Sequence, residues 1–175
     1  MSDLLRKWFR RDDGAAAIEF SMLLIPYLML SLGIIEMSLM FLSASLLEGA
    51  TDSAARLVRT GQIQQSGEDP EAMFREALCE FAVVLVECND MQIEMVKLDS
   101  YADYTQASYD ADGNFVSQGV DPGGSNDKIL IRVAYRYSMI TPLVGPLLNG
   151  ADGTTLFVST IVLQTEPYEF QGGES

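Results

Sequence analysis

The chain has 175 residues, a net charge of −14 and no histidine, and these values already exclude several classes of protein. An acidic chain without a basic patch repels phosphate backbones, so we expect no nucleic-acid binding. Histidine is the commonest general base and zinc ligand. Because the chain has none, we expect that it is not an enzyme and that it has no metal or cofactor site. The length allows one folded domain and an anchor.

Charge is distributed unevenly along the chain. Residues 1–14 carry four basic and three acidic side chains and sum to +1, which leaves −15 for the rest. Basic residues that precede an apolar segment, with few following it nearby, favour a cytoplasmic N-terminus. We therefore expect residues 1–14 to be a cytoplasmic leader and the acidic part of the chain to be exported.

A long apolar segment follows the leader. Residues Ala15 to Leu47 are apolar or small except for Glu19 and Glu36, and the run exceeds the roughly 20 residues that cross a bilayer. At about 1.5 Å per residue, Glu36 lies roughly 32 Å beyond Ala15. We therefore expect Glu36 at the far membrane interface or in contact with a partner.

The length of the segment argues against a secretory signal peptide, whose apolar core has only about 7–15 residues. A small-residue sequence, Ser43-Ala44-Ser45, nevertheless follows the apolar run. Cleavage near Ser45, releasing an exported enzyme or calcium-binding protein, therefore stays an open alternative.

Gly14 closes the charged leader directly before the apolar run. This order resembles a prepilin cleavage site, where a membrane peptidase cuts after the glycine and leaves the apolar helix intact. Cleavage there would give Ala15 a cationic amino group able to pair with Glu19 of a neighbouring subunit, beside Phe20. The alternative is that Glu19, about 6 Å inside the helix start, simply reaches toward the lipid headgroups.

Further residues extend the likeness beyond the cleavage motif. The stretch from Gly14 to Arg59 resembles the TadE-like family of pilus-assembly proteins over about a quarter of the chain. The residues that carry it are Gly14–Phe20, Pro26, Gly33–Glu36 and Ala54–Arg56. After Glu36 the chain departs mildly from the family pattern, which often has a small or basic residue and then an aromatic one.

The resemblance implies a minor pilin or pseudopilin of a tight-adherence (Flp-type) pilus, processed by prepilin peptidase after Gly14. It also implies a bacterial inner-membrane location, an exported periplasmic head, and action beside the major pilin, other minor pilins and the pilus platform proteins. Incorporation into the fibre stays open. The alternative is an unprocessed single-pass membrane adaptor that binds an envelope partner through its acidic head.

The rest of the stem and the start of the head have clear local signals. Pro26 lacks a backbone N–H and should kink the helix, and Gly61 can cap its end, so residues 15–61 are predicted to form one transmembrane and stem helix. Residues 62–68 are polar and loop-like. Asp69 and Pro70 then suit the start of a second helix. Its apolar positions recur at helical spacing: Met73, Phe74, Ala77, Leu78, Phe81, Ala82 and Leu85.

The chain has two cysteines, Cys79 and Cys88. On an unbroken helix they would lie about 13.5 Å apart along its axis, too far for a bridge. A disulfide therefore requires the second helix to end near Val86. An oxidising periplasm favours this structural disulfide over two free thiols, which is the alternative.

The sequence predicts strands in three segments: residues 91–98, 128–138 and 154–165. The middle one alternates, with Ile129, Ile131, Val133, Tyr135 and Tyr137 on one face, as in a half-buried antiparallel strand. The fold class predicted is α+β and pilin-like, with a long N-terminal transmembrane helix packed with a second helix on a small antiparallel sheet. Residues 62–175 would form the periplasmic head.

The remaining segments are predicted to be turns and loops. Residues 104–117 suit a hairpin whose turn is Asp110–Asn114, because the spacing of that turn does not fit a calcium loop. The segment 141–150 is either a loop that touches a partner or a short turn of helix over the sheet edge. The tail after Glu166 has the composition of a disordered segment.

Overall fold

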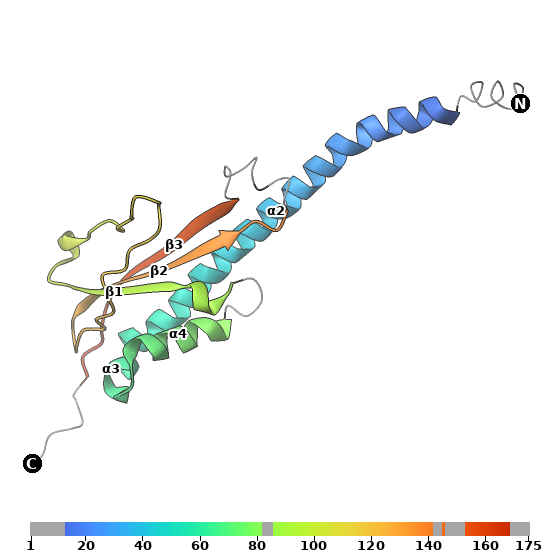
Figure 1. Ribbon diagram of the computed structural model, residues 1–175. Coiled ribbons are helices and arrows are strands. Elements are labelled where there is room, and N and C mark those ends of the chain that lie inside the picture. Colours follow the sequence, from blue (N-terminus) through green and yellow to red (C-terminus); the bar gives the residue numbers. More distant parts are fainter. Residues whose placement is uncertain (1–12, 82–85, 142–144, 146–152, 169–175) are drawn as a thin grey trace, which may run out of the picture.

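The computed structural model describes residues 13–81, 86–141, 145 and 153–168, and Figure 1 shows their arrangement. A single long helix, α2 (Asp13–Arg59), runs from the N-terminus into a head made of two short helices and a three-stranded sheet. Most of the predicted leader, residues 1–12, lies outside the described residues. So do Ala82 and Leu85 of the predicted second helix.

The stem helix α2 follows the prediction closely. Gly61 adopts a left-handed conformation at φ +74° and its N–H donates to the carbonyl of Val58, so it caps the helix as expected. Pro26 lies inside the continuous helix, whose N-terminal part curves away gradually from the axis of the rest (Figure 1). The predicted kink is thus a gentle bend, because one missing N–H removes a single hydrogen bond.

Two helices follow the stem. The prediction of a loop at residues 62–68 is wrong, because α3 (Gln62–Ser66) forms a short helix that buries Ile63 between two left-handed glycines. The second predicted helix is confirmed as α4 (Pro70–Phe81), and the Asp69 carboxylate accepts a hydrogen bond from the N–H of Ala72 at 3.1 Å. Phe74 and Leu78 of α4 are fully buried against the stem and sheet.

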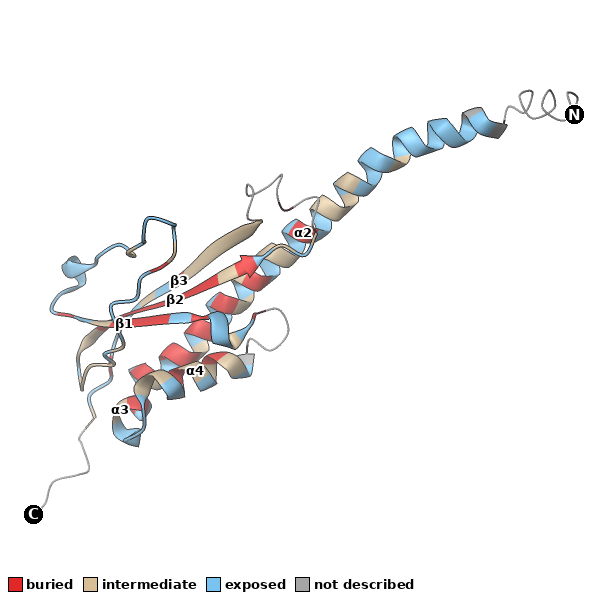
Figure 2. Ribbon diagram, viewed as in Figure 1, coloured by how far each residue is buried: buried red, intermediate tan, exposed pale blue. Residues whose placement is uncertain are grey.

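The sheet has three antiparallel strands in the order β1 (Gln92–Leu98), β2 (Lys128–Ser138) and β3 (Thr154–Gln164). All three were predicted within one residue at each end. The two helices α2 and α4 pack on one face of the sheet and bury a common apolar core (Figures 1 and 2). The α+β, pilin-like fold class is therefore confirmed.

The prediction that β2 is half-buried is wrong. Leu130, Arg132 and Ala134, on the face opposite the helices, are also buried, because the connection from β1 to β2 folds over them. Arg132 and Glu94 form an ion pair at 2.7 Å, and both side chains are fully buried. Arg132 also donates to the carbonyl of Thr105 and stacks over the Tyr104 ring, so it fastens this connection to the sheet.

The predicted hairpin at residues 104–117 is present only as one antiparallel bridge between Tyr109 and Phe115. The C-terminal segment differs from the prediction of disorder as far as Tyr168. The N–H of Glu166 donates to the carbonyl of Arg59, and the N–H of Tyr168 donates to Ser125. Residues 169–175, and all of the segment 142–150 except Gly145, lie outside the described residues.

Candidate functional site on the stem helix

The predicted cleavage bond, Gly14–Ala15, lies in the first turn of α2. Gly14 is exposed, and a Cβ atom placed on it would meet no other atom within 4 Å. The described part of the chain therefore leaves this glycine open to a protease. Processing at this bond stays a prediction.

Glu19 and Phe20 follow one turn later, and both are exposed. Within residues 13–81, 86–141, 145 and 153–168, the Glu19 carboxylate has no hydrogen-bond or ion-pair partner. A carboxylate within an apolar segment is costly unless it is paired. The predicted pairing with an amino group of another subunit is therefore chemically suitable, and it stays a prediction.

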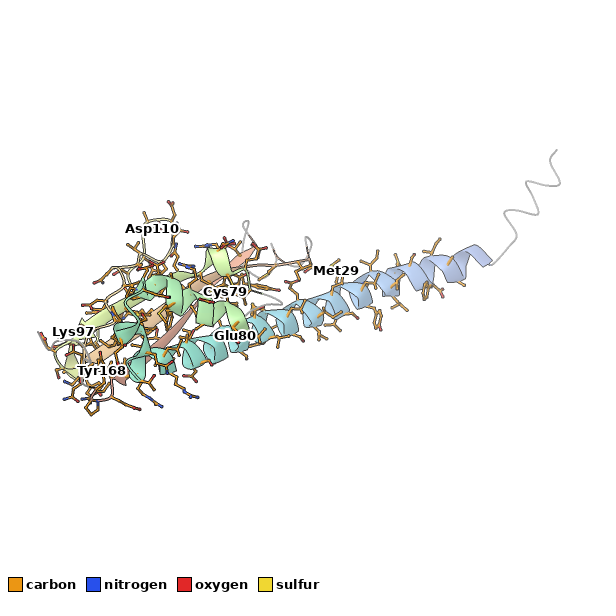
Figure 3. All side chains as sticks on the ribbon, turned by 90° about the horizontal axis from the view of Figure 1, so that it is seen from below. Met29, Cys79, Glu80, Lys97, Asp110 and Tyr168 are labelled. Atoms are coloured by element: carbon orange, nitrogen blue, oxygen red, sulfur yellow. A yellow bond between two sulfur atoms is a disulfide. The ribbon has the colours of Figure 1, made fainter. Side chains whose placement is uncertain are left out.

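The first half of α2 presents apolar side chains on all sides, and Figure 3 shows them projecting from the helix away from the head. Phe20, Met22, Leu23, Ile25 and Leu30 are each more than 60% exposed. The helix is long and apolar enough over Ala16–Arg59 to cross a membrane. Such a surface is unfavourable in water and suits a bilayer or the apolar helices of other proteins.

Glu36 marks the point where the head meets the stem. Its carboxylate is buried, with 1% of the residue exposed, and accepts four hydrogen bonds from the end of β2 and the residues after it. Oε1 accepts from the Tyr137 hydroxyl at 3.1 Å and the Ile140 N–H at 3.0 Å. Oε2 accepts from the N–H and the hydroxyl of Thr141 at 3.0 and 2.8 Å.

The predicted contact of Glu36 with a partner stays a prediction. Both oxygens are occupied by the same chain, because the three donor residues converge on the helix where the head begins. The predicted position of Glu36 at the membrane interface stays a prediction. The pKa of Tyr137 is raised to about 12, mainly by burial of its hydroxyl and secondly by the hydrogen bond to Glu36. We call Glu36, Tyr137, Ile140 and Thr141 the head clamp.

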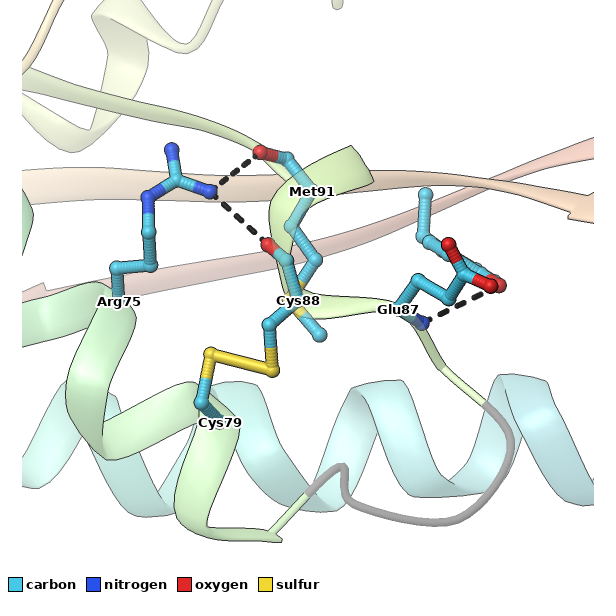
Figure 4. The surroundings of a disulfide bond; sticks show 6 residues. Arg75, Cys79, Glu87, Cys88 and Met91 are labelled. Carbon is cyan, nitrogen blue, oxygen red and sulfur yellow. Dashed lines mark hydrogen bonds between the residues drawn. A yellow bond between two sulfur atoms is a disulfide. The ribbon is translucent and has the colours of Figure 1, made fainter.

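Cys79 and Cys88 form a disulfide, with Cα atoms 5.6 Å apart. The bridge was predicted to require that the second helix end near Val86, and in the structure Val86 lies outside any helix. Arg75 of α4 donates to the carbonyls of Cys88 and Met91 at 3.1 and 2.9 Å (Figure 4). The disulfide and the Arg75 guanidinium together link α4 to the segment that leads into β1.

The Asp110–Asn114 segment forms a turn, as predicted. The Asp110 carboxylate accepts hydrogen bonds from the N–H groups of Asp112 and Asn114 and from the Asn114 amide. The bond from the Asn114 side chain is the main reason that the pKa of Asp110 lies below its ordinary value. Among the described residues, no group of three or more acidic or cysteine side chains is placed to hold a metal ion.

The sequence did not indicate the donors of the head clamp or the buried pair of Glu94 and Arg132. Tyr137 and Arg132 read as members of an alternating strand, and Thr141 as the start of a loop. Arg132 shares its face of β2 with Lys128 and Arg136, and nothing in that pattern marks it as the buried one. No sequence pattern links Glu36 to residues more than 100 positions away.

The fold and the exposed apolar half of α2 define a pilin-like protein, and among the described residues α2 is the one helix long and apolar enough to cross a membrane. Residues 14–56 match the family model of the TadE-like protein, which confirms the resemblance over the stem and includes Gly14, Glu19 and Glu36. A search of curated proteins gave no match to the chain. A search of solved structures also gave none.

Proposed function

We propose that this protein is a minor pilin or pseudopilin that helps to assemble a tight-adherence pilus. One observation carries the proposal: the segment that matches the TadE-like family coincides with a helix whose first half is apolar and exposed, and no described residue pairs with its Glu19. Such a helix needs an apolar environment and a cationic group, and an assembly of processed subunits supplies both.

In this proposal α2 anchors the chain in a bacterial inner membrane, with residues 1–14 in the cytoplasm and residues 62–175 in the periplasm. Prepilin peptidase cuts after Gly14, and the new amino group of Ala15 pairs with Glu19 of a neighbouring subunit. Phe20 packs beside this pair. The neighbours are the major pilin, other minor pilins or pseudopilins, and the platform proteins of the pilus.

The head clamp gives the stem a defined relation to the head. Because Glu36 is hydrogen-bonded to β2 and to Thr141, a displacement of the helix along its axis carries the head with it. A subunit that is moved out of the membrane during assembly would keep its exported surface in a fixed position relative to its packing helix.

The test is the intact mass and N-terminal residue of the protein isolated from membranes, with and without prepilin peptidase. We expect a peptidase-dependent start at Ala15. Gly14→Ala should prevent processing, whereas Gly33→Ala, a glycine of the same helix that also has open space around it, should leave processing intact.

A mature N-terminus other than Ala15 would support a different function. A mature start at Met1 or Ser2 in the presence of the peptidase would favour the unprocessed adaptor. A start near Leu46 would exclude both membrane-anchored functions. If processing occurs normally, Glu19→Ala should abolish pilus assembly, while Glu76→Ala, at an exposed glutamate of α4, should not.

A further inference from the structure

The outer edges of β1 and β3 differ in their backbone hydrogen bonding. The outer edge of β1 is covered by the segment 117–121. The Met95 N–H donates to the carbonyl of Gly119, and the Met95 carbonyl accepts from the N–H of Asp121, both at 2.9 Å. The Ser117 hydroxyl donates to the carbonyl of Ile93. No described residue pairs with the outer edge of β3 between Leu156 and Leu163.

Hydrogen bonds at the two ends of β3 show which of its residues face this open edge. The Thr165 N–H donates to Asp127, and the Met139 N–H donates to Gly153; each donor lies directly opposite its acceptor in the register of β2 and β3. In an antiparallel pair, directly opposite hydrogen-bonded residues alternate with unbonded ones. The odd-numbered residues of β3 therefore bond to β2. The even-numbered ones direct N–H and C=O to the open edge: Leu156, Val158, Thr160 and Val162.

The composition of β3 makes this edge unusual. From Thr154 to Gln164 the strand has no charged residue, no proline and no glycine. Natural sheets usually protect an exposed edge with lysines, prolines, bulges or a covering segment, because unpaired backbone groups recruit other strands. The β1 edge has such a cover, and the described chain provides none for β3.

A groove runs beside this edge, between β3 and α2. It contains two adjacent hollows, of about 360 and 240 Å³, which share Asp52 and Ile161. Going away from the membrane half of the helix, α2 contributes Glu48 and Asp52 and then Arg56 and Arg59. Arg59 is partly engaged by Glu166 at 3.8 Å, whereas Arg56 has no ion-pair partner among the described residues.

We propose that the open edge of β3 binds an extended segment of a partner polypeptide as a fourth strand, with a cationic side chain against Glu48 and Asp52 and an anionic one against Arg56. Alternate side chains of an added strand point toward α2 and would enter the hollows. Glu48 and Arg56 are about 12 Å apart along the helix, close to the roughly 13 Å that four strand residues span. The two charges of the partner should therefore lie four positions apart. This inference does not depend on a role in a pilus.

A second copy of the chain does not fit the edge. Symmetric pairing of two β3 strands is antiparallel, and α2 runs alongside the strands (Figure 1), so the two stem helices would point in opposite directions. Two chains anchored by these helices in one membrane cannot adopt that arrangement. The partner is therefore a different segment, recognised by backbone pairing and by its two charges.

The probe is a synthetic nine-residue peptide of alternating valine and threonine, with lysine at the third position and glutamate at the seventh, capped at both ends and labelled with a fluorophore. Binding to the full-length protein in lipid nanodiscs is followed by fluorescence anisotropy. Thr160→Pro removes one outward N–H and, because that group does not bond to β2, keeps the β2–β3 pairing. Thr160→Val is the matched control.

We expect the wild type and Thr160→Val to bind the peptide, and Thr160→Pro to bind at least about tenfold more weakly. Glu48→Lys makes both ends of the groove basic. It should therefore reverse the preference, so that a peptide with glutamate at both positions binds more tightly than the original one. This second variant keeps the test valid if circular dichroism shows that Thr160→Pro is unfolded.

Four results would overturn the proposal. The first is equal binding by the wild type and a folded Thr160→Pro. The second is unchanged peptide preference in Glu48→Lys, and the third is that no peptide binds at millimolar concentration. The fourth is a dimer in nanodiscs that Thr160→Pro dissociates, because the edge would then belong to a second copy of the chain.

Discussion

The Glu36 carboxylate accepts a hydrogen bond from the Tyr137 hydroxyl at 3.1 Å, across 101 positions of sequence. This contact joins the stem helix to the central strand of the head. The carboxylate is buried, and every donor around it is a polar group of the head. Its removal should therefore lower the stability of the whole head.

Glu36→Gln should lower the free energy of unfolding of the head by about 2 kcal/mol, because an amide offers one acceptor oxygen and turns an NH₂ group toward backbone donors. Urea unfolding of the full-length protein in detergent, followed by circular dichroism, measures the change. Glu48→Gln, at an exposed position of the same helix, is the control and should change stability little. Equal effects of both variants would contradict the role of the head clamp.

Tyr137 should make the head sensitive to alkaline pH. Its pKa is raised from 10.0 to about 12 by burial and by the Glu36 hydrogen bond, so the folded state holds the phenol proton more tightly than the unfolded state. This stabilisation is fully present below pH 10 and is lost as pH rises toward 12. Urea midpoints at pH 8, 10 and 11 should fall more steeply for the wild type than for Tyr137→Phe. Parallel slopes would argue against this linkage.

The disulfide should stabilise the region between α4 and β1. It closes a loop with a sequence separation of nine, for which loop-closure entropy gives about 2–3 kcal/mol. Reductant should lower the urea midpoint of the wild type and leave that of the Cys79→Ser/Cys88→Ser variant unchanged. A thiol assay on the purified protein, unfolded without reductant, should find no free thiol; two free thiols per chain would contradict the bridge.

The buried pair of Glu94 and Arg132 predicts strong non-additivity. Arg132→Met should destabilise the head by about 3–5 kcal/mol, because Glu94 is left as a buried charge without its partner. Glu94→Gln combined with Arg132→Met should cost less than the single Arg132 change, since no uncompensated charge remains. A double-mutant cycle of urea unfolding measures the coupling. Additive effects would show that the two side chains act independently.

Local signals predicted most of the elements. The apolar run, Gly61, and the pair Asp69 and Pro70 fixed the ends of the helices, because capping and chain-breaking residues act on their own neighbours. Alternation along β2 and the apolar strand β3 predicted the sheet. The short helix α3 was missed because its five residues are polar except for Ile63, and burial of that one side chain was not visible in the pattern.

By itself the sequence determined the apolar anchor, the order of helices and strands, and the family match over residues 14–56, since these depend on composition and short-range spacing. Only the tertiary structure decided that Glu36 turns into the head, that Arg132 is buried beside Glu94, and that no described segment pairs with the outer edge of β3. The physical reason is that each of these features depends on which segment covers a given face. Those segments are tens of residues apart in the sequence, so local patterns do not identify them.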